Sequence, residues 1–150
     1  PAHGESFRAN AAAYCKKLAA LDREYSQAVE TASFKTLVFG DRFPFRYLTD
    51  DYGLAYYAAF AGCSAETEAS FRTIVFLAQK TDELGLPAVM TIEGAHHKIA
   101  ETIVENTSAK DQKILTLNSM QGTTTADVQS GATYLSMMEE NLDVLKQALH

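Results

Sequence analysis

Thr36-Leu37-Val38-Phe39-Gly40-Asp41-Arg42 is the stretch of sequence that decides the fold. Its first four residues form an apolar run without polar alternation, which is typical of a strand that is buried on both faces. A glycine, an acid and a base follow at once, so the chain passes from core to polar surface over a few residues. We therefore predict a strand over residues 36–39 that ends at Gly40, with Asp41 and Arg42 just beyond its carboxyl end.

The same kind of run returns further along the chain, and helical patterns separate the runs. Strands are predicted at Ala55–Phe60, Ala88–Ile92 and Ile114–Leu117. Helices are predicted from Pro44 to Gly53, from Ser64 to about Leu84, from His97 to Asn106 and from Thr125 to Leu149. Strands that alternate with helices pair in parallel, because each crossover brings the chain back to the same edge of the sheet. The predicted fold class is α/β, a three-layer αβα domain with a four-stranded parallel sheet.

A long helical pattern precedes the sheet. Between Glu5 and Ala32, apolar residues recur at steps of three and four, and the segment contains no proline or glycine. Its length would be roughly 40 Å, which is long for a small domain. We expect its N-terminal part to extend beyond the domain that the strands form.

Composition argues against several classes of function. The 150 residues carry 13 basic and 19 acidic side chains, a net charge of −6, which is unsuited to nucleic acid or to an anionic membrane surface. The nucleophile elbow, P-loop, dinucleotide fingerprint and zinc-protease motif are all missing from the sequence. Cys15 and Cys63 lack zinc-knuckle spacing, and we expect two buried or half-buried free thiols. The chain begins at Pro1 without a signal-peptide pattern, which we interpret as an excised or processed piece.

Polar side chains gather where the predicted strands end. Parallel α/β sheets bind ligands beyond the carboxyl ends of their strands, where the loops converge. That edge is predicted to hold Asp41, Arg42, Glu93, His96, His97, Asn118 and Gln121. Oxygen and imidazole nitrogen are ligands that zinc and manganese accept. The predicted metal ligands are Asp41, Glu93, His96, Asn118 and Gln121.

The two acids also have other interpretations. Asp41 precedes a helix and would favour its N-terminus through the helix dipole. Glu93 would form a structural ion pair with Arg42 across the edge. Together, Asp41 and Glu93 would suit general acid–base catalysis in a small α/β enzyme, although two acids on separate loops are a weak signal.

The remaining polar residues have structural interpretations as well. His96 and His97 are adjacent, so their side chains diverge and at most one points easily into a cleft. A solvated position at the start of a helix suits either of them. Asn118 and Gln121 are equally suited to holding loop backbone in place through their side-chain amides.

Several motifs resemble the solute-binding proteins that deliver zinc or manganese to ABC importers, many of them lipid-anchored or first described as adhesins. Residues 45–48 (Phe-Arg-Tyr-Leu) and 51–54 (Asp-Tyr-Gly-Leu) are similar to the family's aromatic helix and its Tyr-Gly-Leu stop. Residues 130–142 look like its final helix, and residues 10–25 look like the long helix that joins its two lobes. The resemblance implies an inter-lobe helix, residues 1–33, and a C-terminal lobe, residues 34–150, of a two-lobed parent.

The resemblance also implies where this lobe would supply metal ligands. Family members bind one ion between two lobes, and each lobe contributes two ligands. One lies just before the aromatic helix, where this chain has Arg42, and the other follows the fourth strand, where it has Asn118. A guanidinium has no lone pair to offer a metal. Either the neighbouring residues Asp41 and Gln121 or His96 supply the ligands, or Arg42 holds a small anionic or organic ligand through its planar fork.

Partners and location follow from the same resemblance. The parent would close on zinc or manganese and present the ion to an ABC permease without covalent chemistry, so we expect no enzyme. Its location would be extracytoplasmic, at the cell surface or in the periplasm, with or without a lipid anchor. Without the N-terminal lobe, we expect weak metal binding and an exposed, partly apolar face that favours a weak homodimer.

Overall fold

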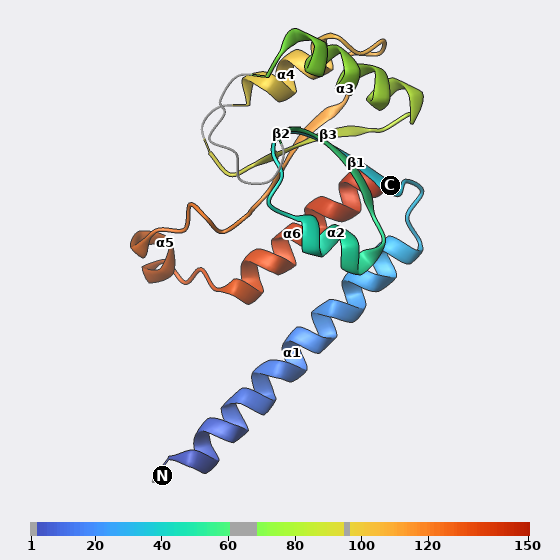
Figure 1. Cartoon of the computed structure of the whole chain (residues 1–150). Coiled ribbons are helices and arrows are strands. Elements are labelled where there is room, and N and C mark those ends of the chain that lie inside the picture. Colours follow the sequence, from blue (N-terminus) through green and yellow to red (C-terminus); the bar gives the residue numbers. More distant parts are fainter. Residues whose placement is uncertain (1–2, 61–68, 95–96) are drawn as a thin grey trace.

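The computed structural model in Figure 1 describes residues 3–60, 69–94 and 97–150. Its elements are α1 (Gly4–Glu30), β1 (Thr36–Arg42), α2 (Arg46–Tyr52), β2 (Ala55–Phe60), α3 (Phe71–Glu83), β3 (Ala88–Ile92), α4 (Lys98–Glu105), β4 (Lys113–Leu117), α5 (Thr125–Gln129) and α6 (Tyr134–Leu149). The strands form one sheet in the order β2-β1-β3-β4, with every neighbouring pair parallel. The predicted α/β class and its four-stranded parallel sheet are confirmed.

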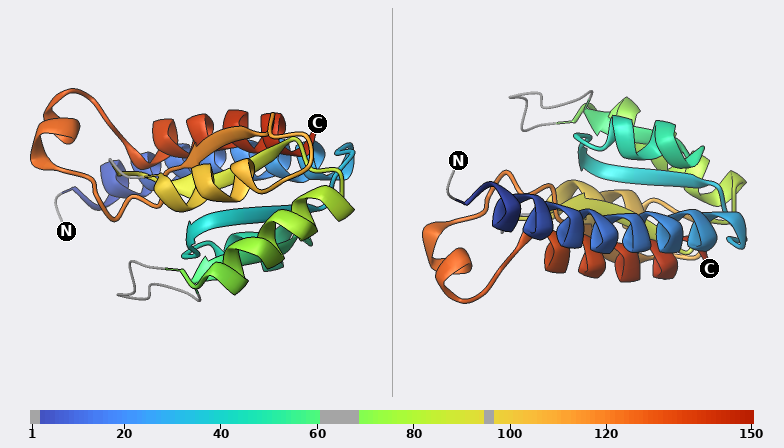
Figure 2. Two further views of the ribbon diagram at one scale, coloured as in Figure 1. Left: turned by 90° about the horizontal axis from the view of Figure 1, so that it is seen from above. Right: turned by 90° about the horizontal axis from the view of Figure 1, so that it is seen from below.

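Helices cover both faces of this sheet. α1, α2 and α6 lie on one face, and α3 and α4 lie on the other (Figures 1 and 2). The first face buries the larger core, which includes Phe39, Leu117 and Leu145, and the second buries a smaller core that includes Val38 and Ile103. Successive residues of β1 enter opposite cores because side chains alternate along a strand. The three-layer αβα arrangement is thereby confirmed.

β1 runs further than the sequence predicts. It continues through Gly40 to Arg42, so Asp41 and Arg42 belong to the strand itself. The strand can continue beneath α4 only because residue 40 is a glycine. A Cβ added at Gly40 would stand 2.5 Å from the Cα of Ala100 in α4. The backbones of β1 and α4 therefore approach each other at a distance that only a residue without a side chain allows.

Two helix boundaries were predicted wrongly. α3 begins at Phe71, where the hydroxyl of Ser70 accepts a hydrogen bond from the backbone N–H of Thr73; the predicted cap, Ser64, lies outside the described residues. The single helix predicted from Thr125 to Leu149 is two helices, α5 and α6. Gly131 has φ +98 between them, a conformation that an α-helix cannot include.

α1 is anchored only at its C-terminal end. Its buried residues begin at Leu21, whereas Phe7 and Tyr14 are exposed on the half that projects from the domain (Figure 1). Tyr25 is the main anchor: its hydroxyl donates to the carbonyl oxygen of Met138 in α6 at 2.7 Å, and its ring stacks on Tyr52 of α2. Burial, followed by the neighbouring Tyr52, raises the pKa of Tyr25 far above its usual value, so the hydroxyl stays a donor.

Two further observations concern α1 and the helices in general. Cys15 lies on the projecting half of α1 and is an exposed free thiol, so the prediction that it is buried or half-buried was wrong; Cys63 lies outside the described residues. None of the helices in the described part of the chain has the length and hydropathy needed to cross a membrane.

We expect Gly40→Ala to lower the free energy of unfolding by about 1–3 kcal/mol, because the added methyl group forces β1 and α4 apart. Urea denaturation of the chain measures this change. Gly4→Ala is the matched control, since the nearest atom to its added Cβ is the end of the Arg8 side chain at 3.8 Å, and alanine is the better helix former. Equal unfolding midpoints for Gly40→Ala and the unaltered chain would contradict the close approach.

Candidate functional site

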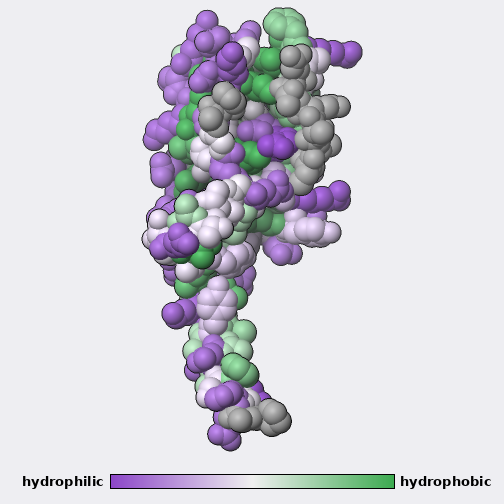
Figure 3. All heavy atoms as spheres, turned by 90° about the vertical axis from the view of Figure 1, so that its left-hand side faces the viewer, coloured by the Kyte–Doolittle hydropathy of each residue, from purple (hydrophilic) through white to green (hydrophobic). Residues whose placement is uncertain are grey.

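The strand order creates a switch point between β1 and β3. From β1 the chain crosses to β2 on one side, and β3 then pairs with β1 on the other side. The loops that leave β1 and β3 therefore diverge, which is where open parallel sheets bind their ligands. Asp41 and Arg42 end β1 at this point, and Glu93 directly follows β3. Figure 3 views the carboxyl edge of the sheet, where hydrophilic residues gather in the middle of the face.

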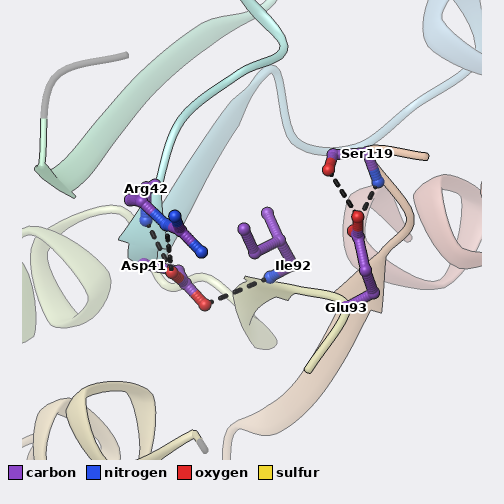
Figure 4. A network of polar contacts seen from close by, with 5 residues as sticks. All are labelled: Asp41, Arg42, Ile92, Glu93 and Ser119. Atoms are coloured by element: carbon purple, nitrogen blue, oxygen red, sulfur yellow. Dashed lines mark hydrogen bonds and ion pairs between the residues drawn. The ribbon is translucent and has the colours of Figure 1, made fainter. Parts of the chain in front are cut away.

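Asp41 joins the ends of β1 and β3. One carboxylate oxygen accepts a hydrogen bond from the backbone N–H of Ile92 at 3.4 Å, and the other accepts from the backbone N–H of Arg42 at 2.8 Å (Figure 4). The cap position of α2 belongs to Phe45, so Asp41 serves strand pairing and does not cap that helix. A carboxylate can accept about four hydrogen bonds, and within the described residues these two backbone N–H groups use two of them.

Arg42 stands beside Asp41 at the same strand end. Its Nε lies 3.9 Å from the nearer oxygen of Asp41, and 44% of its side chain is exposed. Within the described residues it forms no ion pair with Glu93, whose carboxylate points instead toward Ser119 (Figure 4). The structural ion pair considered for Arg42 and Glu93 is therefore not formed.

Glu93 binds the loop that follows β4. Its carboxylate accepts hydrogen bonds from the backbone N–H of Ser119 at 2.6 Å, from the hydroxyl of Ser119 at 2.6 Å and from the backbone N–H of Gly122 at 3.1 Å. Partial burial of the side chain acts to raise the pKa of Glu93, but the hydrogen bonds from Ser119 and Gly122 outweigh it and lower the pKa. The residue is thus an anion whose acceptors are occupied by the loop.

The side chain of Asn141 holds the backbone of Asn118 through two hydrogen bonds. The backbone N–H of Asn118 donates to the side-chain oxygen of Asn141 at 2.7 Å, and the amide of Asn141 donates back to the carbonyl oxygen of Asn118 at 2.8 Å. The side-chain oxygen of Asn118 accepts from the backbone N–H of Met120. The interpretation of Asn118 as a loop-holding residue is therefore confirmed. Asn141 was missed, although a polar residue beside Leu142 on the apolar face of a helix is a signal for such a role.

The remaining predicted polar residues are Gln121, His96 and His97. Gln121 is exposed in the loop after β4, and its backbone N–H donates to the hydroxyl of Ser119 at 3.4 Å. His96 lies outside the described residues. His97 is half-buried at the N-cap of α4, and its buried Nδ1 has no hydrogen-bond partner within the described residues. In residues 3–60, 69–94 and 97–150, no three His, Cys, Asp or Glu side chains form a metal cluster, so the ligand set stays a prediction.

An open hollow of about 580 Å³ adjoins the loop after β4. Its lining includes Glu93, Asn118, Asp127, Ser136 and Glu140. The hydroxyl and backbone of Thr124 donate to Asp127 and lower the pKa of that carboxyl group. The hollow is therefore polar and anionic, and its lining suits a cation better than an anion.

Comparisons with known proteins show which family the chain is similar to. The family model described as ZnuA, zinc-uptake complex component A, periplasmic, matches residues 1–148. The zinc-binding lipoprotein AdcA of Streptococcus pneumoniae is 33% identical over 147 residues, which are 98% of this chain and 28% of that protein. The high-affinity zinc uptake system protein ZnuA of Bacillus subtilis is 29% identical over 99% of this chain and 45% of that protein. The chain thus spans less than half the length of these relatives.

Solved structures of zinc-binding and metal-transporting proteins are similar to this chain over almost its whole length. The Zn(II)-bound ZnuA-like domain of Streptococcus pneumoniae AdcA has a TM-score of 0.75 and 32% identity, covering 99% of this chain and 54% of that one. The laminin-binding protein Lmb of Streptococcus agalactiae, described as having adhesin and metal-transporting activity, has a TM-score of 0.81 and 27% identity, covering 100% of this chain and 55% of that one. With nearly every residue inside the family match, the chain belongs to the ZnuA family of zinc-uptake components.

Proposed function

We propose that this chain is the C-terminal lobe, with the inter-lobe helix, of an extracytoplasmic solute-binding protein that captures zinc for an ABC importer. The observation that carries the proposal is the match of almost the whole chain to about half, or less, of zinc-uptake proteins and their structures. The names of the relatives support zinc; manganese stays a prediction from the sequence. Capture and release need only binding and lobe closure, so no enzymatic step is part of the proposal.

The shape of α1 supports a second lobe. Its N-terminal half stands clear of the domain in Figure 3 and exposes the apolar residues Phe7 and Tyr14. These two residues are seven apart, so they lie on one stripe of the helix. A missing N-terminal lobe that packs on this stripe would face the carboxyl edge of the sheet across a cleft. Self-association through the same stripe, the weak homodimer expected from the sequence, stays a prediction.

The geometry favours some of the predicted ligands over others. Within the described residues, Asp41 accepts two backbone hydrogen bonds of the about four that a carboxylate can accept, and Gln121 is exposed on the neighbouring loop. We propose these two residues, with His96, as the groups that this lobe offers to the ion. The oxygens of Glu93 and Asn118 already accept hydrogen bonds from the loop, which supports a role for them in shaping the site.

The relatives also support the remaining parts of the proposal. The family description places its members in the periplasm, and AdcA is named a lipoprotein. We propose the same side of the membrane for this protein, with a permease as the partner that receives the ion. A lipid anchor on the full-length protein is a further proposal that rests on the name of that relative alone.

Arg42 supports a second candidate function, the binding of a small anionic ligand. Its guanidinium lies at the switch point with 44% of the side chain exposed, and its single ion-pair partner among the described residues is the adjacent Asp41 at 3.9 Å. An exposed guanidinium with an incomplete ion pair has donors left for a carboxylate or phosphate. The anionic hollow beside Glu93 favours the zinc function over this alternative.

We expect the full-length, two-lobed protein to bind zinc at least about 100-fold more tightly than residues 1–150 alone, because each lobe supplies part of the coordination shell. Isothermal titration of both proteins with zinc and with manganese measures the difference. Equal affinities would show that this lobe holds a complete site, and no zinc binding by the full-length protein would contradict the proposed function.

Arg42→Glu in the full-length protein separates the two candidate functions. A positive charge disfavours a cation at about 4 Å by roughly 1–4 kcal/mol, depending on the effective dielectric constant, so its replacement should keep or increase zinc affinity. If the ligand is an anion, binding of citrate or phosphate should be lost, and Asp41→Asn should have little effect.

Arg46→Glu is the control for the change in charge, since Arg46 is exposed on α2 and pairs with Asp50. Zinc binding abolished by Arg42→Glu, in a protein that melts normally and tolerates Arg46→Glu, would contradict both candidate functions.

A further inference from the structure

We infer that Glu93 is a positioning residue, which fixes the loop of Ser119–Gly122 so that Gln121 is presented at the binding edge. The inference rests on the proposed function and gives Glu93 a role different from that of a metal ligand.

The hydrogen bonds form a chain from β3 to Gln121. Glu93 accepts from the backbone and the hydroxyl of Ser119, both at 2.6 Å, so the hydroxyl proton of Ser119 points at the carboxylate. The hydroxyl oxygen is then free to accept, and it receives the backbone N–H of Gln121 at 3.4 Å. Hydrogen bonds to an ionised acceptor are the stronger kind. The position of Gln121 therefore depends on the charge of Glu93, through the hydroxyl of Ser119 two residues earlier in the loop.

The backbone of the loop needs such a restraint. Met120 has φ 64, a left-handed conformation that a residue with a side chain keeps only where its surroundings fix it. Glu93 holds the loop on both sides of Met120, at Ser119 and at Gly122, and Asn141 holds the start of the loop at Asn118. The loop is thus restrained at three points before any ligand binds.

Gly122 lies close against the side chain of Glu93. A Cβ added at Gly122 would stand 3.3 Å from Cγ of Glu93 and 3.6 Å from one of its oxygens. Glutamine has the same shape, but its NH₂ group replaces an acceptor with donors. In Glu93→Gln, the new NH₂ group would face either the backbone N–H of Ser119 or, at the other oxygen's position, the hydroxyl of Ser119 and the N–H of Gly122. Part of the restraint is therefore lost without a change in volume.

Asp82 offers a matched control elsewhere in the fold. It accepts two hydrogen bonds from the backbone N–H of Ser108, at 3.0 and 2.9 Å, and one from the hydroxyl of Ser108 at 2.8 Å. This is the same carboxylate-to-serine contact, but it joins the end of α3 to the loop between α4 and β4, away from the carboxyl edge of the sheet. Asp82→Asn therefore removes an equivalent restraint without touching the site.

The test uses the full-length protein and zinc as the probe. We expect Glu93→Gln to weaken zinc binding by about 10- to 100-fold, the usual effect of removing a residue that orients a metal ligand. Ser119→Ala, which keeps the carboxylate and breaks the chain to Gln121, should also weaken binding, and the double variant should be no weaker than Glu93→Gln alone. Asp82→Asn should lower the melting temperature and leave zinc affinity within about two-fold, because it lies outside the orienting contacts.

Three outcomes would overturn the inference. Zinc affinity unchanged in Glu93→Gln would show that the loop needs no restraint from the carboxylate. Loss of binding in Glu93→Gln with normal binding in Ser119→Ala would show that Glu93 is a direct ligand. Equal losses of affinity in Glu93→Gln and Asp82→Asn would show a general effect of stability. Failure of the unaltered protein to bind zinc would instead overturn the proposed function, and the inference with it.

Discussion

Two carboxylates hold together the ends of three neighbouring strands, and the candidate site depends on them. Asp41 accepts the backbone N–H of Ile92 and so joins β1 to β3, and Glu93 accepts two backbone N–H groups and a hydroxyl from the loop after β4. Parallel strands end without a hairpin, so their last N–H groups need partners from elsewhere. At this edge the partners are carboxylates, so the ends of the strands are restrained by hydrogen bonds to negatively charged side chains.

The rest of the fold places this edge and leaves it open. Gly40 lets α4 pack directly on β1, next to the switch point. α3 and α4 thereby form the layer that covers this face of the sheet. On the other face, Tyr25 and Tyr52 attach α1 to α6 and α2, and α1 continues past the domain with its N-terminal half unpacked. The anchored end of α1 therefore sets the direction in which a second lobe would stand, and the free half provides the surface on which it would pack.

Much of the fold could be predicted from sequence, because short apolar runs indicate buried strands and glycines indicate where helices end. Gly53 ends α2 in the left-handed conformation, as the pattern predicts, and Gly85 follows α3 in the same conformation. The break at Gly131 was missed, since the apolar period continues on both sides of it. For the site, the gathering of Asp41, Glu93 and Asn118 at one edge followed from strand ends, but their partners did not. Ser119, Gly122 and Asn141 are close to them only through pairing across the sheet and packing of α6, which no local pattern records.

Under the proposed function, the hydrogen bonding of these polar groups affects how the lobe would bind an ion. Oxygens that accept hydrogen bonds from the loop are less available to a metal. A lobe in which Glu93 and Asn118 bind the loop would therefore have few ligands left for an ion. An ion that one lobe held fully would bind the open and closed forms equally and would shift nothing between them. With an incomplete set on each side, most of the binding free energy appears only when both lobes meet the ion. The internal bonding of the edge therefore favours a protein in which capture and closure are the same event.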